Sequence, residues 1–321
     1  MAQGLMPRLD AFIAQNRIIA SEFPLNSRTT LALSALLLNM DGLTATKEQL
    51  KAAHAIFKRE TPAISFFRGL GMAPIVTKLA VRDDPEGWMT SAKAAYEVLK
   101  DEGFPRSDYL ALMAFLIAKT GDRVTELAHK GMELYRDRRK LHPMTTSSED
   151  ACYALFRALY KPDLKLSEEA ELAAESDMKG KLPKAAMRSL GQIFSVGDEP
   201  ERLGEKAALL VNALREAKLR LSDDCCVAAA PLCFIWDDVG QTVAEAAELD
   251  AVLRRQKGFS DWGIGRDARL ATALTLIASD RLTGVEDAKK HSKLRDILQI
   301  TTAITLTGEA ARATAAALPG V

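Results

Sequence analysis

The sequence lacks the features that would indicate several common classes of protein. Its 321 residues include 43 basic and 43 acidic side chains, so the formal net charge is zero. A broad nucleic-acid footprint needs an excess of Lys and Arg, and we therefore predict none, although a local basic edge remains open. No apolar run reaches the roughly 18 residues that a membrane helix needs. Aromatic residues are scarce at 6%, but 48% of the chain is hydrophobic, which suffices for a continuous core.

Cysteine and histidine are also rare, and neither shows a metal-binding spacing. The four cysteines are Cys152, Cys225, Cys226 and Cys233, and the four histidines are His54, His129, His142 and His291. There is no CxxC, HxxxH or HExxH pattern among them. We therefore expect free, mostly buried thiols in a reducing cytoplasm, with no metal and no cofactor. The first residues, MAQGLMPRLDAF, show no basic region followed by an apolar core, which also favours a cytoplasmic location.

What the sequence does contain is a recurring apolar segment that ends in an aspartate. The seven segments are LALSALLLNMD, PIVTKLAVRD, MAFLIAKTGD, LFRALYKPD, LGQIFSVGD, APLCFIWD and ALTLIASD, which end at Asp41, Asp83, Asp122, Asp163, Asp198, Asp237 and Asp280. Successive aspartates are 42, 39, 41, 35, 39 and 43 residues apart. Periods of 20 to 50 residues are typical of stacked supersecondary units. The spacing therefore predicts about seven repeats of roughly forty residues.

Each repeat is predicted to hold two helices of different character, A and B. Residues 109–117, YLALMAFLI, have no charged face, so this A helix should be buried on several sides. After Asp122, apolar residues recur at helical spacing on one face, which predicts an amphipathic B helix. No segment shows a convincing strand period. An apolar A helix beside an amphipathic B helix in each repeat predicts an all-α fold of the α-solenoid type.

The aspartates between A and B are predicted to cap the B helices. The adjacent pair Asp237 and Asp238 could instead bind a metal and a diphosphate, but no second acidic cluster has a suggestive spacing. Asp84 precedes Pro85, as expected for an N-cap followed by proline at the first helical position. Asp122 and Asp238 occupy matching places. We therefore predict caps here, and no metal site.

The loops that run from B to the next A differ from one another and contain the unusual residues. They include DEGFPRSD, KLHPMTTSSED and QKGFSDWGIGRD, whereas the A-to-B turns are short and uniform. Recognition residues are often carried on loops that a rigid scaffold holds. The candidate binding residues are Arg106, Tyr109, His142, Trp262 and Arg266.

Each of these loops also has a purely structural interpretation. HPMTTSSED can be a turn at Pro143, followed by Ser147 or Ser148 as the cap of the next helix. In KGFSDWGIGRDAR, Trp262 can pack beneath the terminal unit, and we prefer that interpretation. Alternatively, Trp262 with Arg266 and Arg269 can grip a peptide, a base or a carboxylate. The single GxG in this loop follows no strand, which argues against a dinucleotide site.

The stretches GFPRSDYLALMAFLIAK, HPMTTSSED and KGFSDWGIG resemble the landmarks of an uncharacterised bacterial family defined only as a domain of unknown function. The resemblance extends from about Leu25 to Leu282. It implies a bacterial, cytoplasmic origin and carries no activity, cofactor or catalytic residue to this chain.

We expect residues 1–284 to form the solenoid, with a capping helix over residues 5–23, and residues 285–321 to form a helical cap or tail. The alternative for the tail is a helix that binds a partner or a second copy. The leading functional hypothesis is a non-enzymatic scaffold that binds a protein or peptide. The alternative is an enzyme or small-molecule-binding protein whose pocket lies where long loops converge, with His142, Asp150 and Arg106 in one buried cluster.

Overall fold

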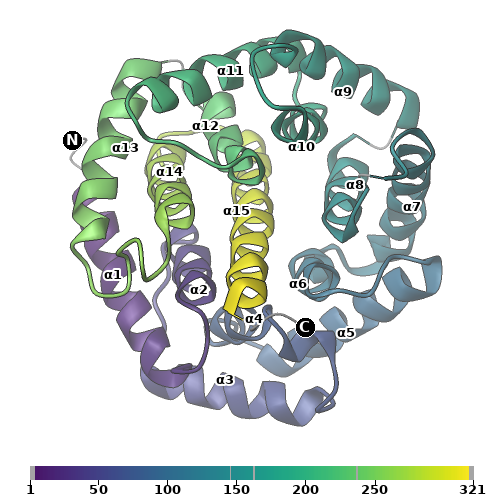
Figure 1. The fold of residues 1–321 in the computed structure, drawn as a ribbon. Coiled ribbons are helices and arrows are strands. Elements are labelled where there is room, and N and C mark those ends of the chain that lie inside the picture. The colour runs from purple at the N-terminus through teal and green to yellow at the C-terminus, as the bar shows by residue number, and fades with distance from the viewer. Residues whose placement is uncertain (1–3, 145, 162, 236–237, 318–321) are drawn as a thin grey trace. The chain divides into compact units, whose positions relative to one another are not determined.

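The computed structural model describes residues 4–144, 146–161, 163–235 and 238–317, and every regular element in these ranges is a helix (Figure 1). The prediction of an all-α fold is confirmed. No helix in the described ranges is long and apolar enough to cross a membrane.

The chain divides into two compact units, and α1 (Leu5–Glu22) and α15 (Ala288–Ala317) contribute to both. Unit 1 comprises Met1–Ala11 and Asp163–Glu309, and unit 2 comprises Phe12–Pro162 and Ala310–Val321.

Unit 2 contains helices that alternate between enclosed and one-sided burial, in the order that the A and B patterns predict. Its elements are α2 (Arg28–Met40), α3 (Lys47–Glu60), η1 (Phe66–Arg68), α4 (Met72–Leu79), α5 (Pro85–Glu102), α6 (Asp108–Ile117), η2 (Ala118–Arg123), α7 (Val124–Leu141) and α8 (Ser148–Tyr160). In α6 all residues from Leu110 to Ile117 are buried, as predicted for an A helix. In α7 the buried side chains include Val124, Leu127 and Tyr135, so the predicted B face is confirmed. We keep the names A for α2, α4, α6 and α8, and B for the helices between them.

Unit 1 continues the alternation. Its elements are α9 (Leu164–Met178), α10 (Lys184–Phe194), α11 (Pro200–Glu216), η3 (Asp223–Ala229), α12 (Ala230–Ile235), α13 (Val239–Arg254), α14 (Arg266–Leu282) and most of α15. The A helices are α10, α12 and α14. The first turns of α1 pack against α14, where Arg8 Nη1 donates to Ser279 Oγ at 2.8 Å and Arg8 Nε lies 3.7 Å from Asp280 Oδ1.

The C-terminal segment is a single 30-residue helix, α15. Residues 296–307 are all buried, so this part of the helix has no exposed face. Its partners in unit 1 include Thr275 of α14, whose hydroxyl lies 3.3 Å from that of Thr302.

The recurring aspartates share a position in the chain but not a structural role. Asp84, Asp163 and Asp238 are N-caps, and each carboxylate accepts a hydrogen bond from a backbone N–H of the following helix at 2.8–2.9 Å. Asp41 ends α2 and pairs with the buried Lys78 instead. The prediction that Asp122 caps its B helix is wrong, because Arg123 occupies the cap position and makes no side-chain cap bond. Asp237 lies outside the described residues.

Candidate functional site

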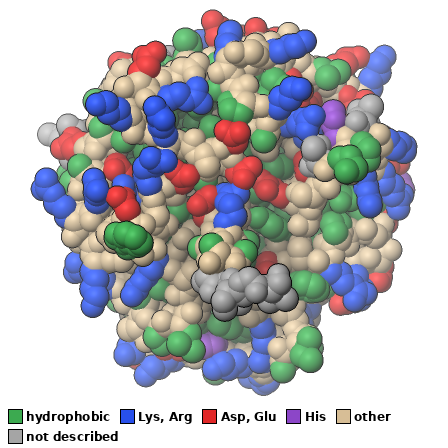
Figure 2. All heavy atoms as spheres, viewed as in Figure 1, with side chains coloured by type: hydrophobic (Ala, Val, Ile, Leu, Met, Phe, Trp, Pro, Cys, Tyr) green, Lys and Arg blue, Asp and Glu red, His purple; other side chains and the backbone are tan. Residues whose placement is uncertain are grey.

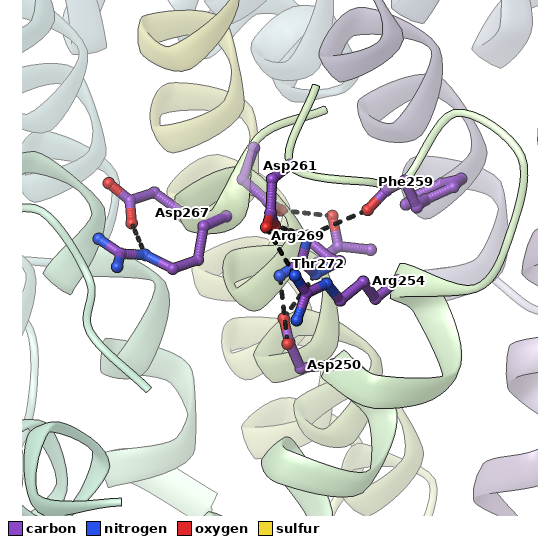
Figure 3. Close-up of polar contacts among 9 residues, drawn as sticks. Asp250, Arg254, Phe259, Asp261, Asp267, Arg269 and Thr272 are labelled. Atoms are coloured by element: carbon purple, nitrogen blue, oxygen red, sulfur yellow. Dashed lines mark hydrogen bonds and ion pairs between the residues drawn. The ribbon is translucent and has the colours of Figure 1, made fainter. Parts of the chain in front are cut away.

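The loop before α14, residues 255–265, is held by a buried arginine. Arg269 is only 2% exposed, and its guanidinium donates to Asp250 Oδ1 at 2.8 Å, to Asp261 Oδ1 at 2.6 Å and to the Phe259 carbonyl at 3.1 Å (Figure 3). Arg254 adds a second bond to Asp261 at 3.0 Å. Arg269 therefore fastens the loop to α13 and is not available to bind a ligand, in contrast to the binding role considered from the sequence.

Arg269 and Asp261 each stabilise the charged form of the other. Burial by itself lowers the pKa of Arg269, but its hydrogen bonds and ion pairs with Asp250 and Asp261 outweigh burial and raise that pKa. The hydrogen bond from Arg269 lowers the pKa of Asp261. Both groups therefore stay charged at neutral pH, and the loop stays fastened.

Trp262 projects from this fastened loop and is 100% exposed. Phe259 and Ile264, on either side of it, are buried and anchor the loop to the core of unit 1. The preferred interpretation that Trp262 packs beneath the terminal unit is therefore wrong. Within the described residues Trp262 makes no ring contact, whereas Trp88 in unit 2 is half-buried and donates its Nε1–H to the Phe115 carbonyl at 3.3 Å.

A pocket of about 430 Å³ opens beside the loop. It is lined by Asp261, Gly265, Arg266, Asp267 and Glu309. The Arg266 side chain is more than half exposed, and its Nε lies 3.5 Å from Asp267 Oδ1. Glu309 Oε1 accepts a hydrogen bond from Cys225 Sγ at 3.0 Å. The lining of the pocket therefore contains three carboxylates and one guanidinium, and arginines already pair with Asp261 and Asp267.

The described residues include no group of three or more His, Cys, Asp or Glu side chains placed to hold a metal ion. All four cysteines are free and buried, as predicted. Burial raises the pKa of Cys152 well above its usual value and raises the pKa of both Cys226 and Cys233 to about 12. These three thiols stay protonated at neutral pH, which makes them poor nucleophiles.

The three candidate residues of unit 2 lie around two B-to-A loops. Arg106 is exposed in the loop before α6, and Tyr109 is half-buried in the first turn of α6. His142 is half-buried and ends α7, and its carbonyl accepts hydrogen bonds from the Thr146 N–H at 3.1 Å and hydroxyl at 2.8 Å. Trp262 and Arg266 share the loop of unit 1 described above. Arg106 and Tyr109 thus lie at one B-to-A loop, and Trp262 and Arg266 lie at another, as their closeness in the sequence requires.

Asp150 has a structural role. It is buried, accepts a bond from Arg138 Nε at 2.7 Å and accepts another from the Ser147 N–H at 2.8 Å, which forms a capping box with Ser147. The interpretation of HPMTTSSED as a turn followed by a serine cap is confirmed for Ser147. Because Arg106 is exposed, it does not join Asp150 in a buried cluster.

Sequence reasoning missed three further exposed side chains, one in each of three B-to-A loops of unit 2. Leu25 is 98% exposed, Ile64 99% and Met144 94%. They precede α2, α4 and α8. Their signal was present in the sequence as apolar residues inside short loops rich in proline and hydroxyls, but such residues are often buried.

The sequence profile of a family described as "Protein of unknown function (DUF4003)" matches residues 18–308. The chain therefore belongs to this family. The match begins before and ends beyond the stretch from Leu25 to Leu282 that the landmarks indicated, so it includes most of α15. No curated protein and no solved structure matches the chain.

Proposed function

We propose that this chain is a non-enzymatic helical-repeat scaffold of the α-solenoid type, with about seven helix pairs, that binds a protein or peptide through its B-to-A loops. The bacterial, cytoplasmic setting is part of the same proposal and is favoured by the free, buried thiols. Extended binding surfaces are typical of helical-repeat proteins.

The observation that carries the proposal is the exposure of Trp262 on a loop that is held in place. Burial of a fully exposed tryptophan side chain releases a large hydrophobic free energy. Tryptophan is also among the residues most enriched at the energetic centres of protein interfaces. The Arg269 contacts fix the loop before any partner arrives, so binding would cost little additional ordering of the chain. In the pocket beside it, the more than half-exposed Arg266 offers a guanidinium for polar contacts.

The test uses photo-crosslinking in the native host with the full chain. A photoreactive phenylalanine derivative is placed at Trp262 and, in a matched control, at Leu172, an exposed leucine on α9. We expect a discrete protein adduct from position 262 and none from position 172. The same adduct from both positions, or none from position 262, would refute the proposal.

Once that partner is identified, alanine substitutions show how much each loop contributes to its affinity. Substitutions at Arg106, Tyr109, His142, Trp262 and Arg266 should weaken binding, most strongly at Trp262. Leu43→Ala, in an A-to-B turn, should leave binding unchanged. Weakening by Leu43→Ala alone would place the functional surface on the A-to-B side.

A further inference from the structure

The B-to-A loops of unit 2 combine apolar tips with unpaired cations. Leu25, Ile64 and Met144 expose nearly their whole side chains to water. In these loops or in the adjoining helix turns, Arg28, Lys58, Arg106 and Arg139 are exposed, and within the described residues they make no ion pair. These cations lie at the start of α2, in the last turn of α3, in the loop before α6 and in the last turn of α7.

The loops lie along one edge of unit 2. The helices α2, α4, α6 and α8 pack against one another in this order, and each is preceded by a B-to-A loop. Because a B helix returns the chain between successive A helices, the A helices run in the same direction. A direct contact supports this arrangement, since the Leu70 N–H in the loop before α4 donates to Asp108 Oδ1 at the start of α6 at 3.0 Å.

The composition of these four loops is one-sided. Residues 23–27, 61–71, 103–107 and 142–147 contain Arg68 and Arg106 but no aspartate or glutamate. Over α7 and α8, Figure 2 shows green hydrophobic side chains beside blue Lys and Arg side chains. Acids such as Asp101 and Asp108 lie in the adjoining helix turns, so the attraction for an anion comes from the four exposed cations that make no ion pair. An occupant of this edge should offer negative charge to these cations, together with apolar material.

We infer that this edge, defined by Leu25, Ile64 and Met144 with Arg28, Lys58, Arg106 and Arg139, docks unit 2 on the surface of an anionic lipid bilayer. Separate side chains that are 94–99% exposed need no matching pockets in a lipid surface, whereas a protein would have to supply one for each. Apolar tips enter the boundary between headgroups and acyl chains, and Lys or Arg near an anionic surface adds about fivefold each to binding. This inference goes beyond the proposed function and shares Arg106 with it. The two are tested separately, because the protein partner is sought by crosslinking at Trp262 in unit 1 and lipid binding is measured with vesicles alone.

The first test is sedimentation of the full chain with vesicles of phosphatidylcholine alone or of equal parts phosphatidylcholine and phosphatidylglycerol. We expect binding only to the anionic vesicles, with a loss as salt rises. The variant Leu25→Ser/Ile64→Ser/Met144→Ser should bind at least about a hundredfold more weakly. Its matched control, Leu172→Ser/Leu209→Ser, removes exposed leucines from α9 and α11 and should bind like the wild type.

The charge test uses two variants with the same change in net charge. Arg28→Gln/Arg106→Gln/Arg139→Gln removes three cations from the edge and should weaken binding on the order of a hundredfold. Lys47→Gln/Lys51→Gln/Arg123→Gln removes three exposed cations at or near the A-to-B turns and should have little effect. Equal weakening by both variants would show attraction by overall charge only and would overturn the assignment of this edge.

A second measurement keeps the inference testable if a serine variant fails to fold. All four native cysteines are buried, so an environment-sensitive dye should label an introduced surface cysteine selectively. When anionic vesicles are added, the emission maximum of a dye on Met144→Cys should shift to shorter wavelength. The emission of a dye on Leu43→Cys should not shift. An unchanged dye at both positions, or no pelleting with anionic vesicles, would overturn the inference, and an acidic protein would then be the occupant to seek.

Discussion

The two kinds of connection in unit 2 differ in acidic residues and in exposed apolar side chains. The A-to-B turns, residues 41–46, 80–84 and 118–123, contain Asp41, Asp83, Asp84 and Asp122. Their largest exposed hydrophobic side chain is Leu43, at 44%. Between the helix ends the B-to-A loops contain no acid, although acids such as Asp101 and Glu149 lie in the adjoining helix turns. These loops expose Leu25, Ile64 and Met144 almost fully.

Acids of the A-to-B turns such as Asp84 have structural roles, whereas the exposed apolar side chains of the B-to-A loops do not. Carboxylates at the A-to-B turns satisfy backbone N–H groups, as Asp84 does, or neutralise a buried cation, as Asp41 does for Lys78. Nothing comparable in the fold requires an isoleucine at position 64 or a methionine at position 144 to lie in water. Single exposed apolar side chains are common on protein surfaces, so what supports the docking edge is their position on loops before successive A helices, together with exposed cations.

The largest expected effect contrasts the core with these loops. Leu112 in α6 is 2% exposed, so Leu112→Asp buries an unpaired carboxylate and should cost several kcal/mol, enough to unfold unit 2. Leu25→Asp makes the same chemical change at a site that is 98% exposed and should change stability by less than about 0.5 kcal/mol. Circular dichroism and urea titration measure both. A mild effect at Leu112 would contradict the enclosed position of α6.

The next effect concerns the loop of unit 1. Arg269→Ala leaves Asp250 and Asp261 without their buried partner, and we expect a loss of about 2–3 kcal/mol because Asp261 is half exposed and regains solvation. Hydrogen exchange should rise at residues 258–265. Arg254→Ala removes only an exposed partner of Asp261 and should cost about 0.5 kcal/mol or less. Equal protection of the loop in both variants would show that Phe259 and Ile264 suffice to hold it.

The same cluster sets a pH dependence. The pKa of Asp261 is lowered in the folded protein by its hydrogen bond from Arg269. Its contribution to stability is therefore present above the unfolded carboxyl pKa of about 3.9 and is lost as the pH falls through the lowered folded value. The free energy of unfolding, measured as a function of pH, should be higher for the wild type than for Asp261→Asn above about pH 4. The two values should converge at lower pH. A constant difference down to pH 2 would contradict the ion pair.

The smallest effect tests the A-to-B turns themselves. Asp238→Ala removes a carboxylate that accepts the Gln241 N–H at 2.8 Å and should cost about 1 kcal/mol. Asp122→Ala removes a residue that occupies the same place in the recurring pattern but caps nothing, and should be nearly neutral. The two costs are compared from the midpoints of urea unfolding, provided that both variants have the same dependence of unfolding free energy on urea concentration. Equal costs would mean that the aspartate contributes by its charge near the helix start and not by its hydrogen bond.

Calorimetric titration with Mg²⁺, with and without a diphosphate, offers a further check on this turn. We expect no site that depends on Asp238, because its carboxylate already caps α13. Tight binding that Asp238→Asn abolishes would contradict the capping role.

The sequence by itself determined the helices and many of their ends. Apolar positions without a charged face predicted the enclosed α6, and one-sided spacing predicted α7. Caps at Asp84, Asp238 and Ser147 were also predictable, because a cap hydrogen bond joins residues only two or three positions apart. Local chemistry of this range can be read from a single sequence.

Only the tertiary structure decided which loop side chains face water. Within residues 259–264, Phe259 and Ile264 are buried while Trp262 is fully exposed, and the composition of the stretch does not distinguish them. The choice depends on Arg269, which joins Asp250, 19 residues away, to Asp261 and the Phe259 carbonyl. The contact between Arg8 and Asp280 likewise joins residues that are far apart in the sequence. Helix propensity and capping act over a few residues, whereas exposure is fixed by which distant segments pack together, and that information lies in the folded arrangement.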